Sequence, residues 1–261
     1  MRPSRVPMLT AVVVLIFFYL PIGMLFAQSF NAAKFGGQWD GFSLRWYEEL
    51  WARDDIHAAA WNTILIALVS TVLSVVLGAL AAWCIHRFRS RAQRAHYGLI
   101  YAPLVVPDIL MGISLLFLFV NVGVELNLFT IILSHTTFCL SYVTLVMLGR
   151  LEDFDEAIIE AAQDLGAGWG TIVGRILLPL LGPGLAAGAL LAFTLSIDDF
   201  VITFLVSGPG NTTLPVKIFS MMRRSSPQVI NALSVIFMTV TFVMVIISQR
   251  LTRTTTSTQT T

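Results

Sequence analysis

Six apolar stretches constrain this chain more than any other feature of its sequence. Each is about twenty residues long, which is the length of helix that crosses the hydrocarbon core of a bilayer. They occupy residues 8–27, 63–85, 99–120, 128–148, 184–206 and 229–248. A backbone inside the bilayer must satisfy its own hydrogen bonds, which helices do. The sequence therefore predicts an all-α membrane protein with six transmembrane helices, forming a single domain over residues 1–261.

The composition agrees with a membrane protein and leaves no stretch for a soluble domain of useful size. Hydrophobic residues make up 56% of the chain and charged residues 12%, against about 25% charged in soluble domains. The net charge of +1 gives no indication of a nucleic-acid partner. The apolar composition makes membrane lipid the expected surroundings of the spans. Cys84 and Cys139 both fall in apolar stretches, so neither a disulfide framework nor a paired-cysteine metal site is expected.

The first apolar stretch, residues 8–27, has an alternative interpretation as a cleaved signal peptide. The apolar core of a signal peptide is shorter, and no clear small-residue cleavage site follows this one. We therefore predict a retained first span. The aromatic residues of the loop over residues 30–60 are typical of anchors at a membrane interface.

The basic residues predict on which side of the membrane each loop lies. Six spans place both termini on the same side. The N-terminus, the loops at residues 86–97 and 149–180, and the C-terminal tail hold ten of the sixteen Lys and Arg residues. Because cytoplasmic loops are enriched in these residues, both termini are expected in the cytoplasm. The tail over residues 252–261 is mostly Thr and is predicted to be disordered.

A short amphipathic helix is predicted in the connecting segment over residues 149–183, on the cytoplasmic side. Apolar residues recur there at helical spacing between charged ones: Ile158, Ala161, Ala162 and Leu165. Asp153 and Glu156 have the spacing of an N-terminal capping box. Gly166 stands where the helix needs a left-handed residue in order to stop. We expect Pro179 and Pro183 to open the next span.

A longer pattern covers this helix and the end of the segment: Glu-Ala-Ala, three residues, Gly, nine residues, Ile, one residue and Leu-Pro. The chain meets every fixed position, and the pattern resembles the EAA loop of ABC-importer permeases. The resemblance implies that the helix docks into a cleft on an ATP-hydrolysing subunit. The alternative is a surface helix that packs on its own protein. The candidate coupling residues are Glu160, Ala161, Ala162, Asp164, Leu165, Gly166, Ile176, Leu178 and Pro179.

Three carboxylates fall within the predicted spans: Asp108 in the third, and Asp198 and Asp199 in the fifth. An acid at the centre of a transmembrane helix costs roughly 2.5–3.5 kcal/mol on insertion scales, so these side chains should face a partner, a water-filled path or a cation. Neighbours on a helix point about 100° apart. One of the adjacent pair could therefore line a substrate path while the other holds the fold or a neighbouring subunit. The alternative is that all three are capping residues, interhelical contacts or neutral acids.

No catalytic pattern is present in the sequence. The chain lacks a phosphate-binding loop of the form GxxxxGK[ST] and an evident nucleophile with its base. His57 and His135 stand alone, and a lone histidine on an apolar helix is usually packed or hydrogen-bonded, so we assign neither a role. We expect a chain that is not an enzyme by itself, binds no cofactor or metal, and draws its energy from a partner.

The resemblance extends over nearly the whole chain and is closest to the polyamine branch of ABC-importer permeases, specifically the second permease subunit of spermidine/putrescine importers. The stretches that carry it are Asn31, Gly41-Phe42, Trp46-Tyr47, Pro107-Asp108-Ile109, residues 134–139, residues 193–199 and Gly208-Pro209. It implies a homologous permease partner, two ATP-binding subunits that hold ATP and Mg²⁺, and a periplasmic or surface-tethered solute-binding protein. A polyamine is a flexible polycation, and carboxylates with aromatic walls are its physical match.

Other functions stay open at this point. A secondary transporter driven by H⁺ or Na⁺ could use the intramembrane acids as proton carriers, although the inverted repeat frequent in such folds is not evident. A permease of the same type could carry an anion, an iron carrier or another small solute. A purely structural membrane protein is the third alternative, and the acids within the spans argue against it.

Overall fold

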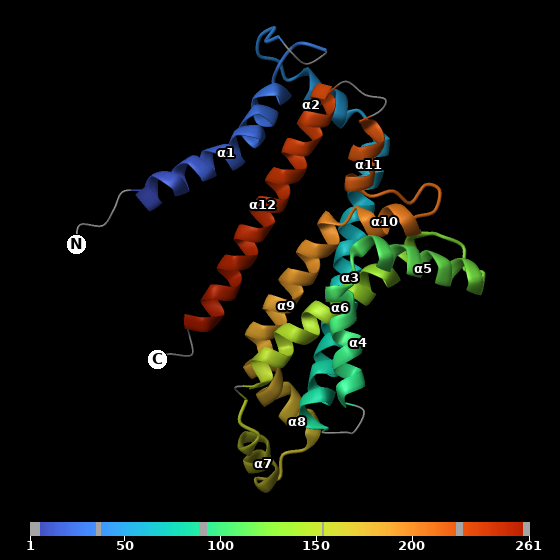
Figure 1. Ribbon diagram of the computed structural model, residues 1–261. Coiled ribbons are helices and arrows are strands. Elements are labelled where there is room, and N and C mark those ends of the chain that lie inside the picture. The colour runs from blue at the N-terminus through green and yellow to red at the C-terminus, as the bar shows by residue number, and fades with distance from the viewer. Residues whose placement is uncertain (1–5, 35–37, 89–92, 153, 223–226, 258–261) are drawn as a thin grey trace. The chain divides into compact units, whose positions relative to one another are not determined.

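The computed structural model describes residues 6–34, 38–88, 93–152, 154–222 and 227–257 (Figure 1). These residues are almost entirely helical. The elements in chain order are α1 Val6–Ser29, α2 Arg45–Trp51, α3 Asp54–Arg87, α4 Gln93–Val105, α5 Asp108–Val122, α6 Leu128–Glu152, α7 Ala157–Asp164, α8 Trp169–Ile172, a π-helical turn at Val173–Leu177, α9 Leu178–Asp198, α10 Val201–Val206, α11 Leu214–Met221 and α12 Pro227–Ser257.

The all-α fold class is confirmed. Five helices in the described part of the chain are long and apolar enough to cross a membrane, and the bent pair of α4 and α5 brings the number to six if it counts as one span. The apolar stretches at residues 8–27, 63–85 and 128–148 lie inside α1, α3 and α6, respectively. Helix α3 has 34 residues, about 51 Å at 1.5 Å per residue, so it extends well beyond the roughly 30 Å hydrocarbon core.

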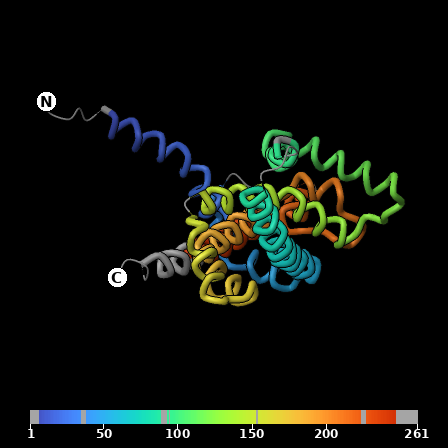
Figure 2. Tube along the Cα trace, turned by 90° about the horizontal axis from the view of Figure 1, so that it is seen from below, coloured from blue at the N-terminus to red at the C-terminus, as the bar shows by residue number. Residues whose placement is uncertain are grey.

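The third predicted span, residues 99–120, is not one straight helix. It divides into α4 and α5, which are bent by 112° at the break (Figures 1 and 2). Pro107 supplies the reason. It has no N–H to donate and disfavours helical backbone at the residue before it, so the chain leaves the helix there. Pro103, by contrast, lies inside α4.

The fifth predicted span, residues 184–206, is displaced relative to the structure. Its helix begins earlier and ends earlier, because Trp169–Asp198 forms one candidate span and the chain breaks before α10. Pro179 lies in the first turn of α9, as expected, but the helix already runs through the π-helical turn before it. Pro179 cannot donate to the carbonyl of Arg175, and the backbone is widened at that point.

The prediction of a disordered tail from residue 252 is wrong over residues 252–257, because α12 continues to Ser257. Extending an existing helix by one residue adds one hydrogen bond without a new nucleation cost, so weak helix formers such as Thr can follow a long apolar span. Residues 258–261 lie outside the described part of the chain.

The contacts divide the chain into two units, Met1–Ala58 with Lys217–Phe242 and Ala59–Val216 with Val243–Thr261. The first unit contains a loop built on buried Asn31. Its side-chain oxygen accepts hydrogen bonds from the amides of Ala33 and Asp40, at 3.1 and 3.0 Å, and its backbone carbonyl accepts one from the Trp46 indole at 2.7 Å. Asn31 and Trp46, which carry part of the resemblance to the polyamine branch, are therefore joined directly by a hydrogen bond in this loop.

The second unit holds the core of the membrane region, in which α6 packs along α9 (Figure 1). Small residues, Gly184 and Gly188 of α9, permit this close approach. A β-carbon added at Gly188 would lie 3.2 Å from a methyl group of Val143, and one at Gly184 would lie 3.1 Å from the Arg150 side chain. Residues of this unit alone form the site described next.

Candidate functional site

The break between α9 and α10 separates the two adjacent acids of the predicted substrate path. Asp198 is the last residue of α9, and Asp199 has extended backbone angles, φ −65° and ψ 127°. The sequence analysis places the two carboxylates one step apart on a single helix, and the structure does not. They belong to different local structures. Asp198 is exposed at the end of its helix, whereas the Asp199 side chain is only 9% exposed.

Asp199 is held by the helix that follows it. Its carboxylate accepts hydrogen bonds from the backbone amides of Ile202 and Thr203, at 3.3 and 2.8 Å, and from the Thr203 hydroxyl at 2.8 Å. These amides belong to the first turn of α10 and have no partner within the helix. Within a bilayer an unpaired amide costs several kcal/mol. By accepting these amides, the Asp199 carboxylate removes that cost at the break between α9 and α10.

His135 of α6 completes this arrangement from the other side. Its Nε2 atom lies 2.9 Å from the Thr203 hydroxyl and 3.3 Å from the Asp199 carboxylate, and its Nδ1 atom lies 2.7 Å from the Ser196 hydroxyl. Ser196 in turn lies 3.0 Å from the Ser70 hydroxyl of α3. One buried chain of polar groups therefore joins α3, α6, α9 and α10.

The hydrogen positions in this network follow from its acceptors. An ionised carboxylate only accepts, and the Thr203 hydroxyl uses its one proton on Asp199. The Nε2 atom of His135, which faces both oxygens, must then carry a hydrogen. This fixes the orientation of the imidazole ring and leaves Nδ1 to exchange a hydrogen bond with Ser196.

A cavity of about 320 Å³ lies at the break. Asp108, Asp198 and Asp199 all border it, so the structure brings the three predicted acids together. Its other lining residues are Phe138, Tyr142, Thr194, Leu195, Phe200, Val201 and Ile202. The wall thus combines carboxylates with aromatic rings, the pairing that attracts organic cations.

Asp108 also stands at a helix break. It is the first residue of α5, directly after Pro107, and it is exposed. A carboxylate at a helix N-terminus is favoured by the unpaired amides there. Both breaks of the membrane helices border one cavity, which agrees with the rule that irregular backbone at membrane depth occurs where it lines a cavity or is buried in protein.

His135 is a residue of this site to which the sequence analysis assigned no role. The expectation that a lone histidine is hydrogen-bonded is confirmed, but its partners come from residues more than sixty positions away in the sequence. The available signal was its place within residues 134–139, one of the stretches that carry the resemblance. Among the described residues, no group of three or more His, Cys, Asp or Glu side chains could hold a metal ion.

The segment that connects α6 with α9 holds the second candidate site. Figure 1 shows α7 and α8 at one end of the second unit, near the ends of α3 and α4; we call this the α7 end. The predicted short helix is confirmed as α7, and so is its stop. Gly166 has φ +79°, and the amide of Ala167 donates to the carbonyl of Ala162 at 3.0 Å.

The start of α7 differs from the prediction. Asp153 lies outside the described residues, and Glu156 makes no cap hydrogen bond through its side chain. The Asp155 carboxylate accepts the amide of Ala157 instead, at 2.9 Å. Glu156 is drawn away by two basic side chains of α3: Arg87 at 3.1 Å and His86 at 3.6 Å.

The apolar residues of α7 divide between a face that packs on the rest of the chain and a face at the surface. Ile159 and Ala162 are buried, together with Ile172 and Leu177 of the following turns. Ile158 and Leu165 are 41% and 89% exposed. Among the candidate coupling residues, those that lie at the surface are Glu160, Ala161, Asp164, Leu165, Gly166, Leu178 and Pro179, while Ile176 is half-buried. An acidic and apolar surface of α7 therefore stays uncovered by the described residues.

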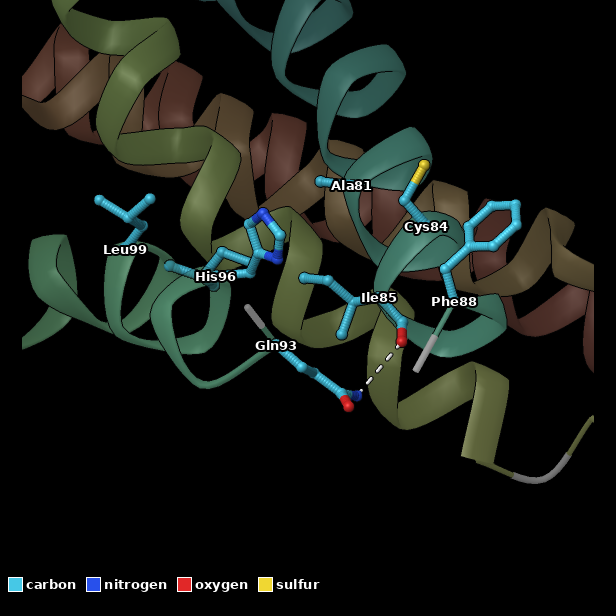
Figure 3. A pocket seen from close by; sticks show the side chains of 8 residues that line it. Ala81, Cys84, Ile85, Phe88, Gln93, His96 and Leu99 are labelled. Carbon is cyan, nitrogen blue, oxygen red and sulfur yellow. Dashed lines mark hydrogen bonds between the residues drawn. The ribbon is translucent and has the colours of Figure 1, made fainter. Parts of the chain in front are cut away.

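A second cavity of about 320 Å³ lies between α3 and α4 near the α7 end (Figure 3). It is mainly apolar. The lining residues are Ala81, Cys84, Ile85, Phe88, Gln93, His96, Leu99 and Ile100. Gln93 donates to the carbonyl of Ile85 across one side, at 3.4 Å, and Cys84 is an exposed free thiol.

Comparison with known proteins places these features in a family context. A family model described as "Binding-protein-dependent transport system inner membrane component" matches residues 74–256. The spermidine/putrescine transport system permease protein PotC of Haemophilus influenzae is 40% identical over 241 residues, which cover 92% of this chain and 94% of that protein. The putrescine transport system permease protein PotI of Escherichia coli K12 is 42% identical over 229 residues, which cover 85% and 82%.

Solved structures share the fold at much lower identity. A bacterial ABC transporter involved in the import of the acidic polysaccharide alginate contains a chain with a TM-score of 0.74 and 17% identity, covering 94% of this chain and 92% of that one. The MetNI methionine ABC transporter in an inward-facing conformation gives a TM-score of 0.66 at 18% identity, covering 80% and 98%. At these identities the likeness concerns the fold alone.

Proposed function

The chain belongs to the family of inner-membrane components of binding-protein-dependent transport systems, and from this premise we propose that it is the permease subunit of an ATP-driven importer of polyamines. Its relatives PotC and PotI are named for spermidine and putrescine transport. The observation that carries the substrate class is the cavity at the α9–α10 break, where Asp108 and Asp198 share one wall with Tyr142 and Phe200.

The three acids that border the cavity differ in whether their carboxylates already have partners within the protein. The Asp199 carboxylate already has His135, Thr203 and the amides of α10 as partners, so it is not available to a substrate ammonium group. Asp198 and Asp108 are exposed and have no ion pair within the described residues. Two carboxylates without internal partners suit a substrate with two or more ammonium groups, and the aromatic rings suit its methylene chain and its charge. We therefore assign Asp198 and Asp108 to the substrate path, and Asp199 to the fold.

The energy for transport comes from partner subunits that hydrolyse ATP. A dimer of ATP-binding subunits would hold ATP and Mg²⁺ and hydrolyse the nucleotide, while this chain binds no cofactor and catalyses no reaction. A homologous second permease would complete the path, and a periplasmic or surface-tethered protein would deliver the substrate. A ligand shifts a two-state equilibrium only through different affinities for the two states. Here that ligand is ATP, and the segment from Glu160 in α7 to Gly166 at its stop passes the shift to the membrane helices.

This mechanism requires both termini and the α7 end to face the cytoplasm, where ATP is. The distribution of Lys and Arg in the sequence supports this orientation. Several of these residues, among them Arg2, Arg5, Arg89 and Arg91, lie outside the described part of the chain. Labelling of a cysteine introduced at Glu160 with a membrane-impermeant reagent tests it: right-side-out vesicles should protect the site, and inside-out vesicles should expose it.

Uptake of radiolabelled spermidine and putrescine by the complete transporter in proteoliposomes tests the function. We expect uptake to depend on ATP, to stop with vanadate and to persist with a protonophore. Asp198→Asn and Asp108→Asn should each lower uptake at least about tenfold, because each removes a charge that a desolvated ammonium needs. Glu125→Gln, the same change in an exposed residue outside the cavity, is the matched control. Unchanged uptake in both Asp variants would remove the support for a cation path.

The ion-driven alternative gives the opposite pattern in the same assay. A secondary transporter would lose uptake with the protonophore and keep it with vanadate. If neither polyamine is taken up, the permease carries another small solute, and the pocket of the binding protein should identify that solute.

A further inference from the structure

Two residues connect the α7 end with the core of the membrane helices. One apolar cluster lies among the spans and includes Val143 and Met147 of α6, and another lies under α7 around Ile172. Among the described residues, Trp83 of α3 and Phe154, just before α7, are the ones that pack against both clusters. Their rings meet edge to face, with centroids 6.3 Å apart and an interplanar angle of 72°. This geometry is favourable for aromatic pairs.

An ion pair lies next to this ring contact. Glu156 stands two residues after Phe154, and Arg87 stands one helical turn after Trp83. The Arg87 guanidinium donates to the Glu156 carboxylate at 3.1 Å, and the His86 ring lies 3.6 Å from its other oxygen. Residues i and i+4 lie on one face of a helix, so Trp83 and Arg87 both turn toward the segment that leads into α7.

The position of α3 in the chain gives these contacts their significance. The backbone joins α7 directly to α6 on one side and to α8 and α9 on the other, whereas α3 is separated from α7 by three further helices. A movement of α7 would reach α6 and α9 through the chain itself. The direct contacts between α3 and the segment that leads into α7, among those described, are made by Trp83, Phe154, Glu156, His86 and Arg87.

We propose that these five residues form a clamp, here called the α3 clamp, that transmits the nucleotide-driven movement of α7 to α3. The proposal rests on the proposed function, because it takes α7 as the helix moved by the ATP-binding subunits. Its residues position α3 and do not touch the substrate. Through the hydrogen bond between Ser70 and Ser196, the same helix α3 reaches the polar network at the α9–α10 break. Movement at the α7 end is thereby connected to the wall of the substrate cavity.

The chain carries a natural reporter for the movement of α3. Cys84 follows Trp83 directly, is exposed, and is one of the residues that line the pocket between α3 and α4 (Figure 3). Cys139, the other cysteine, is buried in the core. The rate at which N-ethylmaleimide alkylates Cys84 should therefore change when α3 shifts against α4. A Cys84→Ser variant establishes the background signal.

The experiment compares alkylation of the permease subunit in the complete transporter, nucleotide-free and trapped with ATP and vanadate. We expect a rate difference between the two states in the unmodified protein. Glu156→Gln and Arg87→Glu should each shrink this difference about two- to threefold, the size expected for loss of an exposed ion pair. Combining Arg87→Glu with Glu156→Arg should restore it. Phe154→Leu should shrink it further, because it removes the ring contact while keeping an apolar side chain.

Glu152→Gln is the matched control, since it neutralises a nearby exposed carboxylate of α6 and should leave the rate difference unchanged. Two results would overturn the proposal. One is an alkylation rate that does not respond to nucleotide in the unmodified transporter. The other is a response that survives Glu156→Gln and Phe154→Leu, or that the charge exchange fails to restore.

The readout does not depend on the substrate, so the clamp and the proposed function fail separately. If spermidine uptake is absent but Cys84 responds to nucleotide and the variants reduce the response, the clamp stands and the substrate assignment falls. If uptake is present and the variants leave both uptake and the Cys84 response unchanged, the substrate assignment stands and the clamp falls.

Discussion

Two carboxylate–histidine contacts in this protein have similar chemistry and opposite surroundings. Asp199 meets His135 in the interior, where the two side chains are 9% and 1% exposed. Glu156 meets His86 and Arg87 at the α7 end, where the exposed fractions are 40%, 23% and 52%. The interior contact is surrounded by helices and hydroxyl groups, whereas the outer one is open to solvent.

The difference in exposure decides what each contact can do. Breaking a buried pair by removing one partner costs about 3–5 kcal/mol, because an uncompensated polar group stays behind. An exposed pair contributes about 0–1 kcal/mol, because water and salt replace the lost partner. The interior contact is therefore suited to fix one structure, the break between α9 and α10. The outer contact is weak enough to be broken and remade during each transport cycle.

The largest expected effect is that of Asp199→Ala. It leaves the first amides of α10 without their acceptor and removes one of the two oxygens that face Nε2 of His135, and we expect about 3–5 kcal/mol of destabilisation. The measurement is thermal unfolding of the purified permease in detergent, with the yield of monodisperse protein as a second readout. Asp198→Ala, the neighbouring exposed acid, is the matched control and should change stability by less than about 0.5 kcal/mol. Equal effects of the two substitutions would contradict the division of roles between them.

The asymmetry between these neighbours shows where sequence reasoning reached its limit. The six apolar stretches are visible because hydropathy is a local property, and they correspond to α1, α3, the α4–α5 pair, α6, the helix over Trp169–Asp198 and α12. The break after Asp198 is not local. Residues 200–206 are as apolar as the helix before them, and the polar partner that stabilises the break, His135, comes from α6.

The two faces of α7 show the same limit on a smaller scale. Helical periodicity predicts an apolar face of Ile158, Ala161, Ala162 and Leu165. Of these four, Ala162 is buried against the rest of the chain, and the second buried residue of α7 is Ile159. Two adjacent isoleucines fit a short helix equally well, and only contacts with Trp83 and Ile172 decide between them. The stop at Gly166 was predictable, because a left-handed residue is required by the helix end itself.

An intermediate effect is expected at Gly166. Its φ of +79° strains any residue with a β-carbon, although the space beside it is open. Gly166→Ala should therefore cost about 1–2 kcal/mol locally, without a clash and without unfolding the spans. Because the strain falls on the α7 surface that we assign to the ATP-binding subunit, ATP-dependent uptake should drop while membrane yield stays unchanged. Gly166→Asn, which adopts this conformation more readily, should retain more uptake than Gly166→Ala. Identical uptake in both variants would contradict a role for this turn.

The smallest effect on stability, and the sharpest test of the comparison, is that of Glu156→Gln. Because the side chain is 40% exposed, its loss should lower the free energy of unfolding by less than about 1 kcal/mol, and high salt should remove even that difference. The reduced transmission through the α3 clamp should nevertheless persist, since it depends on which residues touch and not on how strongly they stabilise the fold. Thermal unfolding at low and high salt, set beside the Cys84 response in the same preparations, separates the two quantities. A destabilisation as large as that of Asp199→Ala would mean that the outer contact is also a fixed part of the fold, and the mechanical distinction between the two regions would be lost.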